Sequence, residues 1–443
     1  MRNFTCSSCC SVVFFENVRC THCGYTLAYF PDHGLITAIE PIDSGDHDGP
    51  TLYRSLAPQI AGEYRLCANS AAYGVCNSAV AAAEQEPLCQ ACRLNDVIPD
   101  LSDASALEAW QSLERCKRRL LFGLRELRLP IDSRKQRPKN GLMFSFRRDS
   151  PDGKHKVFTG HSDGLITINI AEADDPFREK LRKQLGEGYR TVLGHFRHEI
   201  GHYYWDRLVK DGPWLSVYRR LFGDERLDYA QAVERHYSKG APAGWPQKFV
   251  SAYATMHPWE DWAETWAHYL HIVDTLDTAR SYGVVLRPKA DGVSADEISM
   301  SAPALDFEDF DDLLAGWIPV TIALNSLNRS MGLIDPYPFV LCAKVTEKLR
   351  FIHDVVSHWN AADELRSQVI CAWLERPVAQ SISLRPTGQA ARPTIGLGPK
   401  RRRENTQRPG LSCSQAGSNQ AAHRGRVRRG RSGRMGSRRA ASA

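Results

Sequence analysis

The sequence predicts an α+β protein in which a small cysteine-rich region precedes a larger, mainly helical one. Eight of its thirteen cysteines lie within the first 92 residues at spacings typical of metal sites. After residue 97, apolar residues recur mostly at helical spacing. After residue 386, the composition changes abruptly to Arg, Gly and Ser. We therefore expect a cysteine-rich region of short strands at 1–96, a mainly helical domain with a small sheet at 97–375 and a disordered tail at 386–443.

The cysteine-rich region contains two sets of four cysteines. In each set a Cys-x-x-Cys turn allows two thiolates to meet one zinc ion, and such a closed four-thiolate site is structural. The residues are Cys6, Cys9, Cys20 and Cys23 in the first set, and Cys67, Cys76, Cys89 and Cys92 in the second. The N-terminus lacks the pattern of a secretory signal. We therefore expect a cytoplasmic protein whose reduced thiols bind two structural zinc ions instead of forming disulfides.

Hydrophobic patterns and turn residues predict the other elements in chain order. Short strands are expected at Val12–Phe15 and Tyr25–Phe30. A helix is expected from Leu107 to Leu129, where Pro130 stops it. Strands follow at Leu142–Phe146 and Leu165–Ile170, and then a helix from Asp174 to Arg190. The later elements are a loop and helix at Leu221–Tyr237 and helices at Phe307–Asn328, Val345–Val356 and Ala361–Leu374.

A helix predicted from Gly194 to Leu208 contains the sequence HEIGH at 198–202. His198 and His202 are one turn apart on the same face, so their two neutral imidazoles can hold one zinc ion. Glu199 lies beside them, where it could take a proton from a zinc-bound water. Gly201 is unusual inside a helix, and a small residue there would let another segment approach closely. The alternative is a buried amphipathic helix with two satisfied histidines.

A second helix, from Pro258 to Ile272, supplies candidates for the third zinc ligand. Glu260 and Glu264 are one turn apart on one face, and the tryptophans around them indicate that this helix is buried. Buried carboxylates need a cation. We assign Glu260 as the metal ligand and Glu264 as the carboxylate that orients one of the histidines. The reverse assignment stays open, and Asp261 is a weaker candidate.

The segments HEIGHYYWD at 198–206 and HPWEDWAETWAH at 257–268 resemble those of bacterial zinc-binding metallopeptidases that carry an N-terminal zinc ribbon. The second segment is similar to the third-ligand helix of gluzincins, in which the first Glu binds zinc and the second carboxylate supports a His. The resemblance covers roughly residues 1–360. It implies zinc ribbons, a zincin-like fold and peptidase activity. It also implies an edge strand along the cleft, for which Gly160–Ile170 is the candidate.

These motifs are compatible with two functions. The first is a zinc metallopeptidase that acts on peptides or proteins, with Glu199 as general base and then proton donor. The donor to the developing oxyanion would be Tyr253, which some gluzincins also place seven residues before the ligand, or else His257. The second is a non-catalytic zinc-ribbon adaptor that binds protein or nucleic acid. The few basic residues in 1–100 argue against a phosphate-binding ribbon, and Glu199 favours catalysis because a structural zinc needs no base.

The basic charge of the chain belongs to its tail. Residues 386–443 hold 14 Lys or Arg residues and a single acid, whereas the first 385 residues hold 43 basic and 50 acidic residues. Such a tail can contact nucleic acid nonspecifically, but we favour a solvated, disordered extension. No stretch reaches the ~18 consecutive apolar residues of a membrane span, so none is expected.

Overall fold

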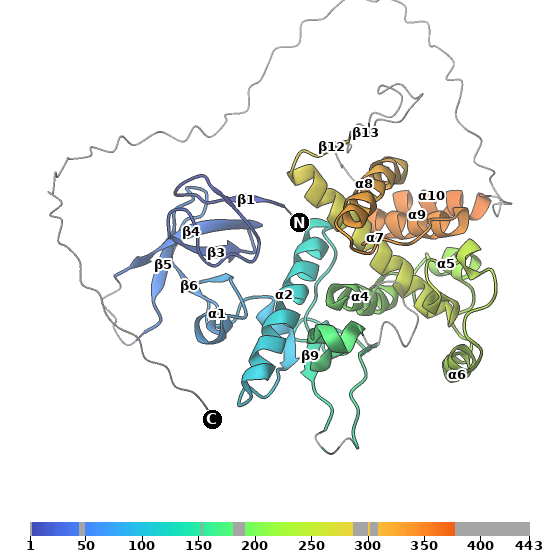
Figure 1. Cartoon of the computed structure of the whole chain (residues 1–443), viewed down its shortest axis with the longest axis horizontal. Coiled ribbons are helices and arrows are strands. Elements are labelled where there is room, and N and C mark those ends of the chain that lie inside the picture. Colours follow the sequence, from blue (N-terminus) through green and yellow to red (C-terminus); the bar gives the residue numbers. More distant parts are fainter. Residues whose placement is uncertain are drawn as a thin grey trace, which may run out of the picture. The chain divides into compact units, whose positions relative to one another are not determined.

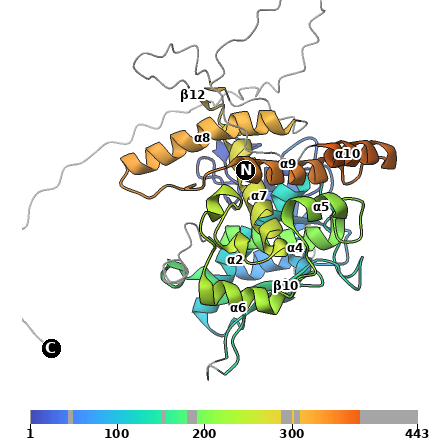
Figure 2. The same cartoon turned by 90° about the vertical axis from the view of Figure 1, so that its right-hand side faces the viewer.

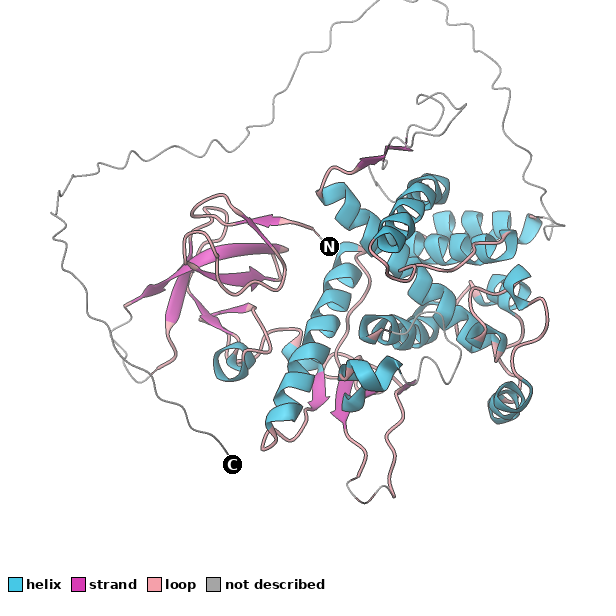
Figure 3. Ribbon diagram, viewed as in Figure 1, coloured by secondary structure: helices cyan, strands magenta, loops and turns pink. Residues whose placement is uncertain are grey.

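The computed structural model describes residues 2–43, 49–150, 152, 154–179, 191–286, 300–301 and 309–376. Strands dominate the N-terminal part and helices dominate the part that follows, so the predicted α+β fold is confirmed (Figure 3). The predicted tail at 386–443 lies outside the described residues. The same holds for residues 307–308 of the predicted helix Phe307–Asn328 and for residues 180–190 of the predicted helix Asp174–Arg190, of which the described residues 175–179 are helical.

The cysteine-rich region is built on a five-stranded antiparallel sheet whose strand order follows the chain (Figure 1). Its strands are β3 (Thr26–Phe30), β4 (Leu35–Ile42), β5 (Leu52–Ser55), β6 (Tyr64–Leu66) and β7 (Ala79–Ala81). Gly34, with φ of +62°, completes the turn between β3 and β4. A separate hairpin pairs β1 (Phe4–Thr5) with β2 (Val12–Val13), so the predicted strand Val12–Phe15 ends two residues early.

Helix α2 (Ala104–Glu126) packs against both parts of the protein. It begins at Asp103, whose side chain accepts a hydrogen bond from the Ser105 backbone N–H. One of its side chains, Phe122, lies among the aromatic residues of the cysteine-rich region, with its ring 5.1 Å from that of Phe15. Trp110 faces the main core and is fully buried. The helix therefore connects the cysteine-rich region to the helical domain.

A small mixed sheet supports one side of the helical domain. Its order is β10 (Gly160–Ser162), β11 (Leu165–Asn169), β9 (Met143–Arg147) and β8 (Asn95–Val97). The expected edge strand Gly160–Ile170 is wrong in extent, because the segment forms a hairpin in which β10 alone lies at the edge and β11 is internal. The cause is the Asp163-Gly164 pair, which adopts positive φ at both residues and turns the chain back.

The remaining helices lie within a few residues of the predicted ranges, except that Leu215–Phe222 was not predicted as a helix and the helix expected at Pro258–Ile272 continues to Ser281. They are α4 (Val192–Leu208), α5 (Leu215–Phe222), α6 (Tyr229–Lys239), α7 (Pro258–Ser281), α8 (Phe310–Ser330), α9 (Ala343–His358) and α10 (Asp363–Glu375). Helices α4 and α7 lie side by side at the centre of the domain, where the rings of Tyr204 and Trp266 stack 5.0 Å apart. Other short elements are α1 (Ala68–Tyr73), the single-turn helices η1 (Cys92–Leu94), η2 (Ile170–Ala173), η3 (Trp245–Gln247) and η4 (Tyr253–Thr255), and a β12–β13 pair (Val285–Leu286 with Met300–Ser301).

Among the described residues, none of the helices combines the length and the apolar character needed to cross a bilayer.

Candidate metal centre

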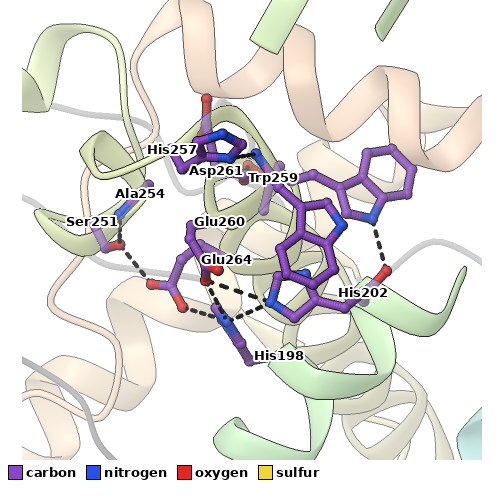
Figure 4. A network of polar contacts seen from close by, with 12 residues as sticks. His198, His202, Ser251, Ala254, His257, Trp259, Glu260, Asp261 and Glu264 are labelled. Carbon is purple, nitrogen blue, oxygen red and sulfur yellow. Dashed lines mark hydrogen bonds and ion pairs between the residues drawn. The ribbon is translucent and has the colours of Figure 1, made fainter. Parts of the chain in front are cut away.

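Helix α4 presents two histidines to one point. Its start is fixed by Thr191, whose hydroxyl accepts a hydrogen bond from the Gly194 N–H at 3.0 Å. His198 and His202 then project from the same face one turn apart, and their Nε2 atoms are 3.2 Å from each other. His202 is buried, and the ring of Trp259 covers it at 3.7 Å between centroids (Figure 4). This packing restricts the orientation of the imidazole.

Helix α7 brings a carboxylate to the same point. The Glu260 Oε2 atom lies 2.9 Å from His198 Nε2 and 3.5 Å from His202 Nε2. Tetrahedral zinc, with bonds of about 2.0–2.2 Å to nitrogen and oxygen, needs ligand atoms about 3.3 Å apart. The three distances therefore fit a two-nitrogen, one-oxygen zinc site, in which Glu260 is almost completely buried.

The other ring nitrogen of His198 meets a second carboxylate of α7. His198 Nδ1 is 2.7 Å from Glu264 Oε1, and the Ser251 hydroxyl donates to Glu264 Oε2 at 2.5 Å (Figure 4). Ser251 is itself held by the Ala254 N–H, 3.1 Å from its oxygen. Because a carboxylate only accepts hydrogen bonds, Nδ1 carries a proton toward Glu264, and a metal bound at Nε2 would take the place of the second imidazole proton.

Charges at this site depend on burial and on these contacts. Burial acts to lower the pKa of His198, but its contacts with Glu260 and Glu264 raise this pKa well above the usual value. Burial raises the pKa of the Glu199 carboxyl, and the two neighbouring histidines oppose that rise. Glu199 is 7 % exposed and sits between the two ligand positions of α4. A cation at the centre would offset the negative charge that the buried carboxylates bring.

Two residues that the sequence left as alternatives are placed elsewhere. Asp261 is buried and pairs with Lys348 at 2.6 Å, so it is not among the atoms that converge with the histidines. His257 is the N-cap of α7: its Nδ1 accepts from the Trp259 N–H, and its Nε2 donates to the Leu227 carbonyl. Both ring nitrogens of His257 are thereby used, and the alternative that made it an oxyanion donor is wrong.

Two tyrosines lie at the candidate metal centre. Tyr253 was expected there from the sequence, and its ring is 5.8 Å from that of His198. Tyr229 was not expected: its hydroxyl donates to Glu260 Oε1 at 2.9 Å, and its ring meets that of Trp259 edge-on. No local signal identifies Tyr229, because it lies at the start of α6 and only tertiary packing brings it to Glu260.

The strand β10 also borders the centre. His161, in the middle of β10, has its ring stacked parallel to that of His202 at 6.3 Å between centroids. Its Nε2 accepts a hydrogen bond from the Gly164 N–H in the adjacent turn. The sequence did not single out His161, since a lone histidine in a strand carries no spacing that indicates a site.

The two cysteine sets each gather around one point. Within each set the Sγ atoms lie within 4.8 Å of one another. The Sγ atoms of Cys6 and Cys23, and those of Cys76 and Cys89, are 3.6 Å apart, close to the ~3.7 Å edge of a tetrahedral zinc–thiolate site. None of the eight is in a disulfide. Helix α1 explains the wide spacing of the second set, because it fills the chain between Cys67 and Cys76.

Comparisons with known proteins agree with both parts of the structure. A family model described as "Putative zinc-binding metallo-peptidase" matches residues 106–355, and a zinc-ribbon domain model matches residues 3–103. Uncharacterized proteins of Mycobacterium bovis and of Mycobacterium tuberculosis strains are 43% identical over 357 residues, which cover 80% of this chain and 95% of each relative. No solved structure matches. The chain therefore belongs to the family of zinc-binding metallopeptidases, with a zinc-ribbon domain at its N-terminus.

Proposed function

We propose that this protein hydrolyses peptide bonds at a zinc site formed by His198, His202 and Glu260. The observation that carries the proposal is the convergence of these three ligand atoms from two helices, with Glu264 on the remaining nitrogen of His198. Three protein ligands leave a coordination position open, as in catalytic rather than structural zinc sites. A bound zinc ion would supply Lewis acidity that polarises the scissile carbonyl and acidifies water.

Glu199 acts in this proposal as the general base. This role is supported by its electrostatic interaction with both His198 and His202 and by burial, which raises the pKa of its carboxyl. Glu199 takes the proton of the attacking water and then returns it to the leaving amine. A structural zinc site has no use for such a residue, so its presence supports hydrolysis over an adaptor function.

The two tyrosines have separate roles in the proposal. Tyr253 donates from its hydroxyl to the oxygen that becomes negative in the transition state, which needs a donor already in place. Tyr229 orients Glu260 through its 2.9 Å hydrogen bond. The β10 edge, which carries His161 beside His202, is positioned to pair with an extended peptide substrate.

Glu199→Gln separates metal binding from chemistry. We expect the variant to keep its zinc content in native mass spectrometry and to lose peptide hydrolysis by about 10²–10⁴-fold. Glu234→Gln, on the exposed surface of α6, is the matched control and should keep both. The substrates would be a mixed peptide library followed by mass spectrometry. Hydrolysis that survives in Glu199→Gln would contradict the mechanism.

A zinc count tests the metal site itself. The three groups of ligand residues predict three zinc ions per wild-type chain, and His202→Ala should bind one fewer. If both chains bind two, α4 holds no metal, and the ribbons would then point to an adaptor that binds protein or nucleic acid.

A further inference from the structure

Helix α8 has a regular apolar stripe along its length. Six apolar residues follow one another at alternating steps of four and three: Leu313, Trp317, Val320, Leu324, Leu327 and the C-cap residue Met331. Steps of this kind place side chains on one face that drifts little around the helix. A stripe with this spacing packs best against another helix that runs alongside it.

The domain covers only the first half of this stripe. Leu313, Trp317 and Val320 are at most 5 % exposed, and the Trp317 ring contacts that of Tyr337 at 4.8 Å. By contrast, Leu324, Leu327 and Met331 are 38 %, 61 % and 65 % exposed. Figure 2 shows the corresponding end of α8 extending past the helices below it. The same stripe therefore begins in the core and ends in solvent.

The exposed surface continues beyond the end of α8. Leu333 and Ile334 follow the turn at Gly332 and are 57 % and 69 % exposed. This loop is anchored: the Asn328 side chain donates to the Ile334 carbonyl at 3.0 Å, and Arg329 pairs with Asp335. The five residues Leu324, Leu327, Met331, Leu333 and Ile334 are called the α8 patch.

The size and charge of the α8 patch indicate what covers it. Its exposed side chains add up to roughly 500 Å² of apolar surface, at the upper end for a monomer that has no partner. Two such patches together reach about 1,000 Å², the lower bound for a specific interface, before any polar rim is added. The helix carries no charged residue between Asp312 and Arg329, so the stripe offers nothing to a strongly acidic or basic partner.

We infer that the α8 patch is the interface of a homodimer in which two copies of α8 pack antiparallel across a two-fold axis. A second copy supplies a stripe of the same spacing and the same lack of charge. Two-fold interfaces use one patch on both subunits, and homodimer interfaces are more apolar than the rest of the surface. The inference does not depend on peptidase activity, because the α8 patch is separate from the metal centre.

Charge substitutions at two exposed positions, about 140° apart around α8, test the interface. Leu327→Glu places two carboxylates near the axis, so this full-length variant should be monomeric where the wild type is dimeric. The measurement is analytical ultracentrifugation of zinc-loaded protein from about 1 to 100 µM. The control is Ile322→Glu: Ile322 is also exposed, but its five-residue offset from Leu327 turns it about 140° around the helix. The control should stay dimeric.

A cross-link distinguishes a second copy from other occupants. A photoreactive residue at position 327, in a mixture of ¹⁴N- and ¹⁵N-labelled chains, should give mixed-isotope adducts within 324–334. Adducts to 287–308 of the same chain would overturn the inference, because the protein would then cover its own patch. A wild type that stays monomeric at 100 µM would also overturn the inference. The same applies if that monomer sediments with lipid vesicles, because a membrane would then be the occupant of the α8 patch. Both variants should keep the wild-type circular dichroism, since both positions are exposed.

Discussion

Gly201 of α4 lies so close to α7 that a Cβ atom added to it would be 3.0 Å from the Cα of Ala263. The Trp262 indole N–H also donates to the Gly201 carbonyl at 2.9 Å. This contact confirms the expectation that a small residue in the motif allows another segment to approach. Because His202 follows Gly201 directly, the same contact sets the distance from the histidines to Glu260.

Gly201→Ala should therefore destabilise the protein, although alanine favours helices by about 1 kcal/mol. The added methyl group meets the Ala263 Cα and the first side-chain atoms of the buried Trp266, which cannot rotate away, so we expect a net loss of about 1–3 kcal/mol in the free energy of unfolding. Separation of α4 from α7 should also weaken zinc binding at the histidine site. Denaturant titration and competition with a zinc chelator measure the two effects.

Gly123→Ala is the matched control for this substitution. Gly123 also lies inside a helix, but its added Cβ would meet a side-chain oxygen of Asp274 rather than backbone, so the contact can be relieved by a shift of that side chain and its ion pair with Arg197. The control should cost less than Gly201→Ala and leave zinc affinity unchanged. Equal losses in the two variants would mean that helix spacing at Gly201 has no special role.

The long helices were predictable because they carry a long apolar period, whereas the short helices α1 and α5 were missed. The expected range Val345–Val356, for example, lies within the observed α9, Ala343–His358. The sheets were less predictable. The expected strand Tyr25–Phe30 forms β3, but β1, β5, β6, β7 and β8 are two to four residues long, too short to show a period of two. The hairpin of β10 and β11 was missed because β10 (Gly160–Ser162) is three residues long and carries no apolar alternation, although Asp163-Gly164 is a typical turn pair.

The metal centre was predictable where its residues share a helix. The spacing of His198 and His202 on α4, and of Glu260 and Glu264 on α7, determines which side chains share a face. Nothing in the sequence brings Tyr229 to Glu260, because that contact depends on how the loop before α6 packs. The sequence also did not show that both ring nitrogens of His257 are used, because the Nε2 hydrogen bond to the Leu227 carbonyl joins residues far apart in the chain.

Glu264→Gln should weaken zinc binding without emptying the ribbon sites. The amide can no longer offer a charged acceptor to His198 Nδ1, so the imidazole becomes a poorer ligand. Loss of such a partner typically costs 10–100-fold in metal affinity, and we expect about that range here. Titration with a competing chelator, read by native mass spectrometry, resolves the weakest of the bound zinc ions.

Asp261→Asn is the informative comparison, because Asp261 is a buried acid on the same helix. Its partner Lys348 would be left without a counter-charge, which should cost about 3–5 kcal/mol of stability. The folded fraction should nevertheless bind zinc as tightly as the wild type. If Asp261→Asn lost the zinc and Glu264→Gln kept it, Asp261 would have to replace Glu260 or Glu264 in the centre.

Tyr253→Phe should lower kcat, whereas Tyr229→Phe should lower zinc affinity. Each change removes one hydroxyl and leaves the ring. Without the Tyr253 donor, kcat should fall by about 10²–10³-fold at unchanged zinc affinity, because the lost hydrogen bond forms fully only in the transition state. Without the Tyr229 hydroxyl, Glu260 loses its orienting hydrogen bond, so zinc affinity should fall while kcat of the zinc-saturated enzyme stays within a few-fold of wild type. Measuring kcat against zinc concentration separates the two effects, and the opposite pattern would exchange the two roles.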